Sequence, residues 1–182
     1  VVVDGEVGPE LAPVAGKLTE VFFETYPKVL ARFDNPEKPA PRRIVVTFKP
    51  GIKVPAYCSG HSITVSTEWL AKHPDDVGLL THELTHAVQA YPKGEPGWIT
   101  EGIADYARFK YGPKEQPGWK LPAKLTDKQN YLDSYRTSAR FFVWLDDKYP
   151  GAVDKIHWKM QSGKYADGDW KAITDRDLDT LW

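Results

Sequence analysis

Residues 81–108 read THELTHAVQAYPKGEPGWITEGIADYAR, and both the fold and the chemistry are best inferred from this stretch. It contains His82 and His86 with Glu83 between them, in the H-E-x-x-H arrangement of zinc hydrolases. Residues four apart on an α-helix lie one above the other, so both imidazoles can reach one metal ion. Glu83 lies roughly 100° further round the helix, beside the metal, where a general base for a metal-bound water is needed.

The apolar residues around the motif support a helix. They recur at the i, i+3, i+4 spacing of an amphipathic helix, on the side away from the two histidines. They are Val77, Leu80, Leu84, Ala87 and Tyr91. Asp75 and Asp76 precede this pattern, and we expect them to supply the N-cap of the helix. The alternative interpretation is a half-exposed helix on which two histidines fall by chance, because short motifs have a real false-positive rate.

The second half of the stretch supplies a candidate third ligand. Catalytic zinc usually takes three protein ligands and keeps one position for water. Proline and glycine residues after Tyr91 interrupt the chain, so that a second helix carrying Glu101 can return beside the first. Asp105, one turn after Glu101, can accept a hydrogen bond from the free N–H of a liganding histidine. An ordinary acidic surface helix is the alternative.

These motifs carry a resemblance to a known family. H-E-x-x-H followed by a helix with E-x-x-x-D resembles the gluzincin group of metallopeptidases, typified by thermolysin. The fuller strings HELTHAVQAY and PGWITEGIADYAR are similar to the plant basic secretory protein family and its bacterial relatives, which are assigned as peptidases. The similarity continues through HSITVS (61–66), YRTSARFF (135–142) and LDTLW (178–182), and so covers most of the chain. One departure is the formal net charge of −1, which is not basic.

The resemblance implies a zinc metallopeptidase, a hydrolase that acts on peptide or protein substrates. Zn²⁺ would be held by His82, His86 and Glu101. Glu83 would take a proton from the zinc-activated water and deliver it to the leaving amine. Asp105 would orient a liganding histidine.

Two further expectations come from the resemblance. The pattern around Tyr135 resembles the helix tyrosine with which some gluzincins stabilise the oxyanion, so Tyr135 is favoured over Tyr131; a core tyrosine is the alternative. In zincin folds the last strand before the metal helix is an edge strand that pairs with extended substrate. Residues 63–66 are the candidate for that strand, and plain sheet structure is the alternative.

The remaining histidines and the cysteine have simpler interpretations. His61, His73 and His157 have no partner at ligand spacing, and we expect surface or hydrogen-bonded structural residues. Cys58 is the only cysteine, so no internal disulfide can form, and we expect a small packed residue.

The amino-acid composition limits the classes of protein to which this chain can belong. The chain has 182 residues, 41% hydrophobic and 27% charged, as in a soluble globular domain. The small net charge gives no reason to expect nucleic acid as a partner, and no apolar run is long enough for a membrane span. We expect a monomer. The chain opens at Val1 with no signal peptide, which fits a processed or trimmed protein, and the resemblance implies a secreted or cell-envelope location.

The predicted fold is α+β and zincin-like: a small twisted β-sheet packed on the H-E-x-x-H helix, with a mostly helical C-terminal half. We expect one domain over residues 1–182, with the active-site cleft between an α/β part (about 1–91) and a helical part (about 92–182). Strands are expected at 42–48 and 62–67, with loops at 51–60 and 112–130. Helices beyond residues 81–108 are expected at 9–33 with a kink or break at Pro27, and at 68–73, 132–149, 152–161 and 175–182.

Two other functions are compatible with the sequence. One is a catalytically weak zinc-containing module that binds peptide or cell-wall polysaccharide; an intact Glu83 argues against it, because a binding module has no need for a base. The other is a structural zinc site. Structural sites are closed and usually contain Cys, whereas two histidines and one glutamate leave a position open.

Overall fold

The computed structural model describes residues 2–4, 8–92 and 96–182. The chain forms two compact units. The first comprises Val1–Val88 and Ala107–Lys120, and the second comprises Gln89–Tyr106 and Leu121–Trp182. The strands all lie in the first unit, and the second consists of helices and their connections.

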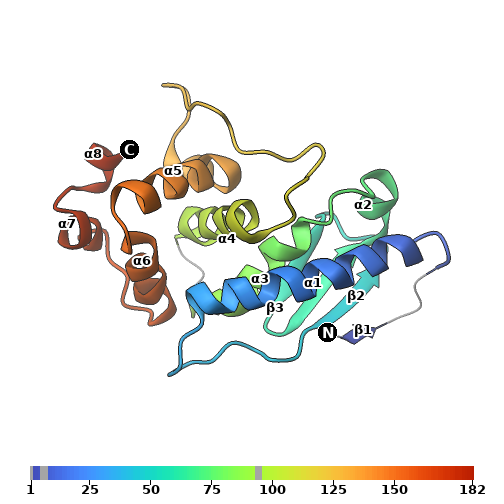
Figure 1. Cartoon of the computed structure of the whole chain (residues 1–182). Helices are drawn as coiled ribbons and strands as arrows, with labels where there is room; N and C mark the ends of the chain where they lie inside the picture. The colour runs from blue at the N-terminus through green and yellow to red at the C-terminus, as the bar shows by residue number, and fades with distance from the viewer. Residues whose placement is uncertain (1, 5–7, 93–95) are drawn as a thin grey trace. The chain divides into compact units, whose positions relative to one another are not determined.

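The first unit is built on a four-stranded sheet in the order β1-β2-β4-β3 (Figure 1). The strands are β1 (Val2–Asp4), β2 (Val45–Lys49), β3 (Ala56–Ser59) and β4 (Ser62–Ser66). β2 is parallel to both β1 and β4, whereas β3 is antiparallel to β4. Alternate residues of the two central strands are buried, as the period of a pleated strand requires. These are Val46 and Phe48 of β2 and Ile63 and Val65 of β4.

The order of the strands corrects one expectation. β4, which contains residues 63–66, lies between β2 and β3 and is therefore not an edge strand. The edge strands are β1 and β3, and β3 falls within the stretch 51–60 that the sequence predicts as a loop. β3 and β4 form a tight hairpin in which Gly60 adopts a φ of 60°, a conformation that suits glycine. The residues of β3 alternate only weakly between apolar and polar, so β3 forms a strand mainly because it pairs with β4.

A long amphipathic helix, α1 (Ala12–Phe33), packs in the first unit. The predicted break at Pro27 is wrong, because the helix runs through it. Proline removes one backbone hydrogen bond, but buried residues on both sides of it, such as Phe22 and Val29, keep the two halves packed. α1 runs beside the helix that carries the H-E-x-x-H motif, to which it is joined by a buried contact from Thr81 Oγ1 to Thr25 Oγ1 of 3.4 Å (Figure 1).

The motif lies on α3 (Leu79–Gln89), as predicted, with Leu80, Leu84 and Ala87 buried. The predicted N-cap is wrong. Asp75 pairs with Lys17 at the surface, and Asp76 accepts hydrogen bonds from Arg108 and from the Trp69 indole. α3 begins only at Leu79, after both aspartates. The expected helix over 68–73 is present as α2 (Thr67–Lys72), capped by Ser66.

The second unit is helical. Its elements are the first part of α4 (Gly97–Tyr111), the 3₁₀ turn η1 (Tyr131–Asp133), α5 (Tyr135–Lys148), α6 (Ala152–Gln161), α7 (Asp169–Thr174) and α8 (Leu178–Leu181). The range of α6 agrees with the prediction. α5 begins later than expected because Asn130 and Asp133 cap η1 instead, and α7 was not predicted. The stretch 112–130 contains no helix or strand, as expected.

Aromatic rings form the core of the second unit. Trp98 stacks on Phe142 with ring centroids 5.7 Å apart, and on Trp170 at 5.8 Å. Gly102 of α4 permits a close approach to α5, since a β-carbon there would lie 2.6 Å from the Cβ of Ser138. The helix with Glu101 is therefore held firmly against the aromatic core.

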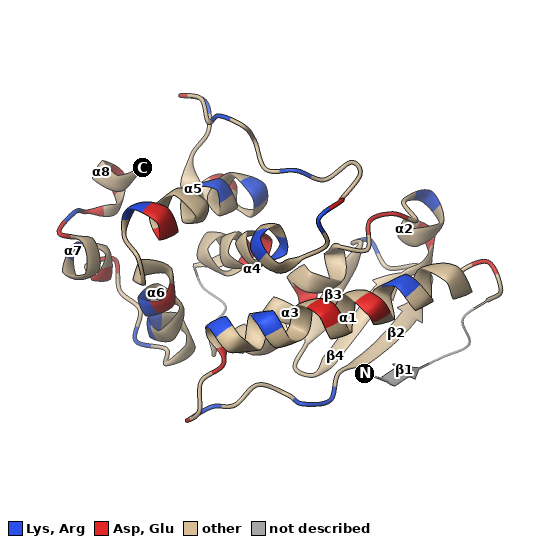
Figure 2. Cartoon of the chain, in the orientation of Figure 1, with Lys and Arg blue, Asp and Glu red and all other residues tan. Residues whose placement is uncertain are grey.

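The α+β class is confirmed. Figure 2 shows that acidic and basic residues are distributed over most of the described helices, in keeping with the small net charge. In the described part of the chain, no helix has the length and apolar character needed to cross a membrane.

Candidate metal centre

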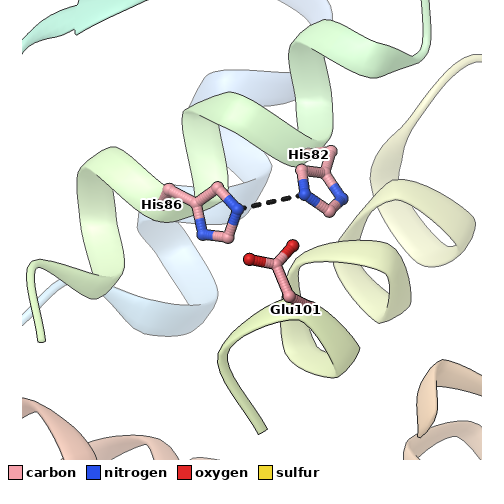
Figure 3. A group of neighbouring side chains, drawn as sticks. All are labelled: His82, His86 and Glu101. Carbon is pink, nitrogen blue, oxygen red and sulfur yellow. Dashed lines mark hydrogen bonds between the residues drawn. The ribbon is translucent and has the colours of Figure 1, made fainter. Parts of the chain in front are cut away.

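His82 and His86 lie on successive turns of α3 (Figure 3). Their rings are nearly perpendicular, at 86°, and their Nε2 atoms are 3.0 Å apart. In a tetrahedral site with bonds of about 2.0–2.1 Å, two nitrogen ligands lie about 3.3 Å apart. The spacing of the two histidines therefore matches that of two ligands of one ion.

Glu101 of α4 completes a group of three. One carboxylate oxygen of Glu101 and one ring nitrogen of each histidine all lie within 4.8 Å of one another, and Figure 3 shows the carboxylate directed at the two imidazoles. Within residues 2–4, 8–92 and 96–182, this is the group of His, Cys, Asp and Glu side chains that can hold a metal ion. The group does not include Asp105.

The chemistry of this donor set fits zinc. Two neutral imidazoles and one carboxylate are ligands that zinc prefers, and three protein ligands leave a fourth position open. His82 is only 8% exposed, whereas His86 and Glu101 are partly exposed.

Glu83 and Asp105 are both buried, with 6% and 4% of their surface exposed. The negative charge of Glu83 acts on Cys58 of the edge strand β3: burial raises the pKa of the Cys58 thiol to about 12, and the Glu83 carboxylate adds to this rise. The raised pKa keeps Cys58 in its thiol form, which does not act as a nucleophile.

The two candidate tyrosines lie in different surroundings. Tyr135 is the first residue of α5 and is 55% exposed. It has a φ of 47° and follows Ser134 with a φ of 65°, both in the left-handed region that side chains other than glycine rarely adopt. Tyr131 donates its hydroxyl hydrogen to Asp179 at 3.2 Å, and burial and this carboxylate raise the pKa of Tyr131.

The other three histidines lie outside the metal group. His157 is fully buried, with its Nδ1 2.9 Å from the hydroxyl of Tyr91. His73 packs against Trp69 with ring centroids 4.1 Å apart and the ring planes tilted by 35°. His61 lies at the exposed turn of the β3–β4 hairpin. The expectation of surface or hydrogen-bonded residues is confirmed.

Two polar contacts near α3 were not predicted. Gln89, the last residue of the helix, donates to the carbonyl of Thr100 at 2.9 Å. Asp76, which precedes the helix, pairs with Arg108. No local pattern in the sequence predicts these two contacts, because their partners are 11 and 32 residues apart along the chain.

Comparison with known proteins gives one match. Neither a curated protein nor a solved structure matches the chain. The model of a family described as "Peptidase of plants and bacteria" matches residues 13–182, which include both helices of the metal group. This confirms the resemblance inferred from the motifs. The chain therefore belongs to this family of peptidases of plants and bacteria.

Proposed function

We propose that this protein is a zinc-dependent metallopeptidase of the gluzincin type, with Glu83 as the general base. Its membership of a peptidase family supports the reaction class. The zinc chemistry rests on one observation, the convergence of His82, His86 and Glu101 with Glu83 adjacent to His82 on α3.

His82, His86 and Glu101 would hold the metal. Bound there, zinc would lower the pKa of a coordinated water to about 7 and polarise the scissile carbonyl group. Glu101 is favoured as the third ligand over Asp105 because the group of converging atoms includes the former. Asp105 lies one turn further along α4 and is buried, so its carboxylate suits the role of orienting a histidine ring.

Glu83 moves the proton. Its carboxylate takes a proton from the attacking water and passes it to the amine that leaves. It follows His82 directly in the sequence but is not part of the metal group, so it is available as a base rather than as a ligand.

Tyr135 donates its phenolic hydrogen to the developing oxyanion in this proposal. Two observations favour it over Tyr131. Backbone strain of the kind at Ser134 and Tyr135 concentrates at functional sites. The hydroxyl hydrogen of Tyr131 is already given to Asp179.

The exposed edge of β3 is proposed to bind the substrate backbone. An extended peptide can add to an edge strand through main-chain hydrogen bonds. β3 is such an edge, and the Glu83 carboxylate contributes to the raised pKa of Cys58 on this strand, which supports the assignment. This assignment replaces the expectation that residues 63–66 serve as the edge.

The test is metal-dependent cleavage of a peptide mixture, with products identified by mass spectrometry. Protein purified without chelator should contain close to one zinc per chain and should cleave peptides. A chelator should stop cleavage, and added zinc should restore it. Cleavage that persists in zinc-free protein, or its absence in zinc-loaded protein over the whole mixture, would refute the proposal.

A further inference from the structure

A buried hydrogen bond joins the end of α3 to the beginning of α4. The Gln89 side-chain amide donates to the Thr100 carbonyl at 2.9 Å, and Gln89 is 1% exposed. Gln89 lies one turn after His86, and Thr100 immediately precedes Glu101. The bond therefore links positions next to two of the three metal-group residues.

A second contact, a largely buried ion pair, links the residues just before α3 to the C-terminal part of α4. Arg108 Nη2 lies 2.5 Å from Asp76 Oδ1, and the two side chains are 6% and 15% exposed. Asp76 precedes α3, and Arg108 lies two turns after Glu101 on α4. The His82–His86 pair is thus bracketed along the sequence by Asp76 and Gln89, and each of these contacts α4.

The ion pair is held in one geometry by its neighbours. The Nε of Arg108 donates to Gln116 at 2.7 Å, and its guanidinium lies 4.2 Å from the ring centroid of Trp119. The second oxygen of Asp76 accepts from the Trp69 indole at 2.8 Å. A guanidinium with several fixed partners has little freedom to rotate.

Buried polar contacts of this kind fix how two segments of the chain lie relative to each other more than they stabilise the folded protein. A buried ion pair often contributes no more to stability than apolar residues of similar volume would, and a buried amide costs free energy unless it is bonded. Each contact, however, is satisfied in only one arrangement of its two segments. A metal site requires its ligands to be held in one arrangement, because each metal–ligand distance must stay within about 0.2 Å of its usual value.

We propose that Gln89–Thr100 and Asp76–Arg108 are positioning contacts that align Glu101 with His82 and His86 and thereby set the metal affinity. These side chains act through the ligands and do not touch the metal. The inference rests on the proposed function, because it takes the three residues to be metal ligands.

The test compares zinc affinity in four variants, measured by competition with a chromophoric chelator. Gln89→Leu and Asp76→Asn each remove one positioning contact. Asp75→Asn removes the neighbouring exposed ion pair with Lys17, and Thr174→Val removes a buried side-chain bond to the Trp170 carbonyl elsewhere in the second unit. The melting temperature of each metal-free variant reports any general loss of stability.

Gln89→Leu and Asp76→Asn should each weaken zinc binding about 10-fold, in the range seen when residues that support metal ligands are lost. Asp75→Asn and Thr174→Val should bind zinc like the wild type, even where Thr174→Val lowers the melting temperature. The visible spectrum of bound Co²⁺ should change in the first two variants only, because it reports ligand geometry. If Asp76→Asn does not fold, Arg108→Lys serves in its place, since lysine keeps the charge but cannot reproduce the fork of hydrogen bonds.

Folded variants of Gln89 and of Asp76 or Arg108 that bind zinc as tightly as the wild type, with an unchanged Co²⁺ spectrum, would overturn the inference. The proposed function would stand in that case. Wild-type protein that binds no zinc would instead overturn both.

Discussion

The Nε2 atoms of His82 and His86 are 3.0 Å apart across one turn of α3. Two nitrogens at this distance either share a proton or both direct lone pairs at one cation. A metal ion that uses both lone pairs replaces a single hydrogen bond by two stronger bonds, and a carboxylate from α4 lies within 4.8 Å to complete the set. These three side chains therefore form the group that could hold one metal ion.

Zinc should stabilise the folded protein. A ligand that binds only the folded state adds about 2.7 kcal/mol to the free energy of unfolding when its concentration is 100 times the dissociation constant. Differential scanning calorimetry with zinc and with chelator should show a higher melting temperature in zinc. His86→Ala should remove the difference, whereas the exposed residue His61 should be replaceable by alanine without effect on it. A zinc effect that survives His86→Ala would place the metal elsewhere.

Glu101 and Asp105 should be separable by zinc titration. Both lie on α4 one turn apart, but only Glu101 belongs to the group of converging atoms. Glu101→Ala should lose most of its zinc, because a direct ligand is removed. Asp105→Ala should still fill at raised zinc concentration, with affinity or activity about 10–100-fold lower. The opposite result would make Asp105 the ligand and replace the gluzincin assignment by a site of two histidines and one aspartate.

Tyr135→Phe should lower kcat about 10²–10³-fold, the range seen when one donor to an oxyanion is removed. KM should change little, because the hydroxyl acts mainly in the transition state. Tyr131→Phe is the matched control: it removes the hydroxyl bonded to Asp179 and should keep kcat near that of the wild type. Steady-state kinetics on one peptide substrate measure both. Equal kcat values for Tyr135→Phe and the wild type would remove Tyr135 from the mechanism.

Cys58 should react slowly with alkylating reagents. A thiol pKa of about 12 leaves the thiolate fraction near pH 8 roughly 10³-fold below that of an ordinary thiol. The negative charge of Glu83 contributes to the raised pKa, so Glu83→Gln should lower the pKa of Cys58 and speed its alkylation at constant pH. Rates measured with iodoacetamide from pH 7 to 10 give the comparison. An unchanged rate in Glu83→Gln would show that β3 and Glu83 are not electrostatically coupled.

The sequence predicted the helices of the candidate site well because their signals are local. The i, i+4 spacing of the histidines and the apolar pattern around them are properties of α3 alone. α6 is similarly bounded by Pro150-Gly151 before it.

Elements that depend on distant partners were missed. β3 (AYCS) contains no β-branched residue and becomes a strand through its pairing with β4. Because the sequence did not predict this strand, it also placed the edge of the sheet wrongly. Asp76 was expected to cap α3, but a better partner, Arg108, comes from α4. The short helix α7 is fixed by the complete burial of Trp170 in the aromatic core, which no local pattern reveals.

The most direct test of the central claim is a paired measurement of zinc content and hydrolysis rate on one preparation of Glu83→Gln. The amide keeps the shape of the side chain but cannot accept the proton of the attacking water. Glu20→Gln, on the exposed side of α1, is the matched control and should behave as the wild type. We predict close to one zinc per chain in Glu83→Gln and a hydrolysis rate about 10²–10⁴-fold below that of the wild type. Full zinc content with hydrolysis at the wild-type rate would contradict the account.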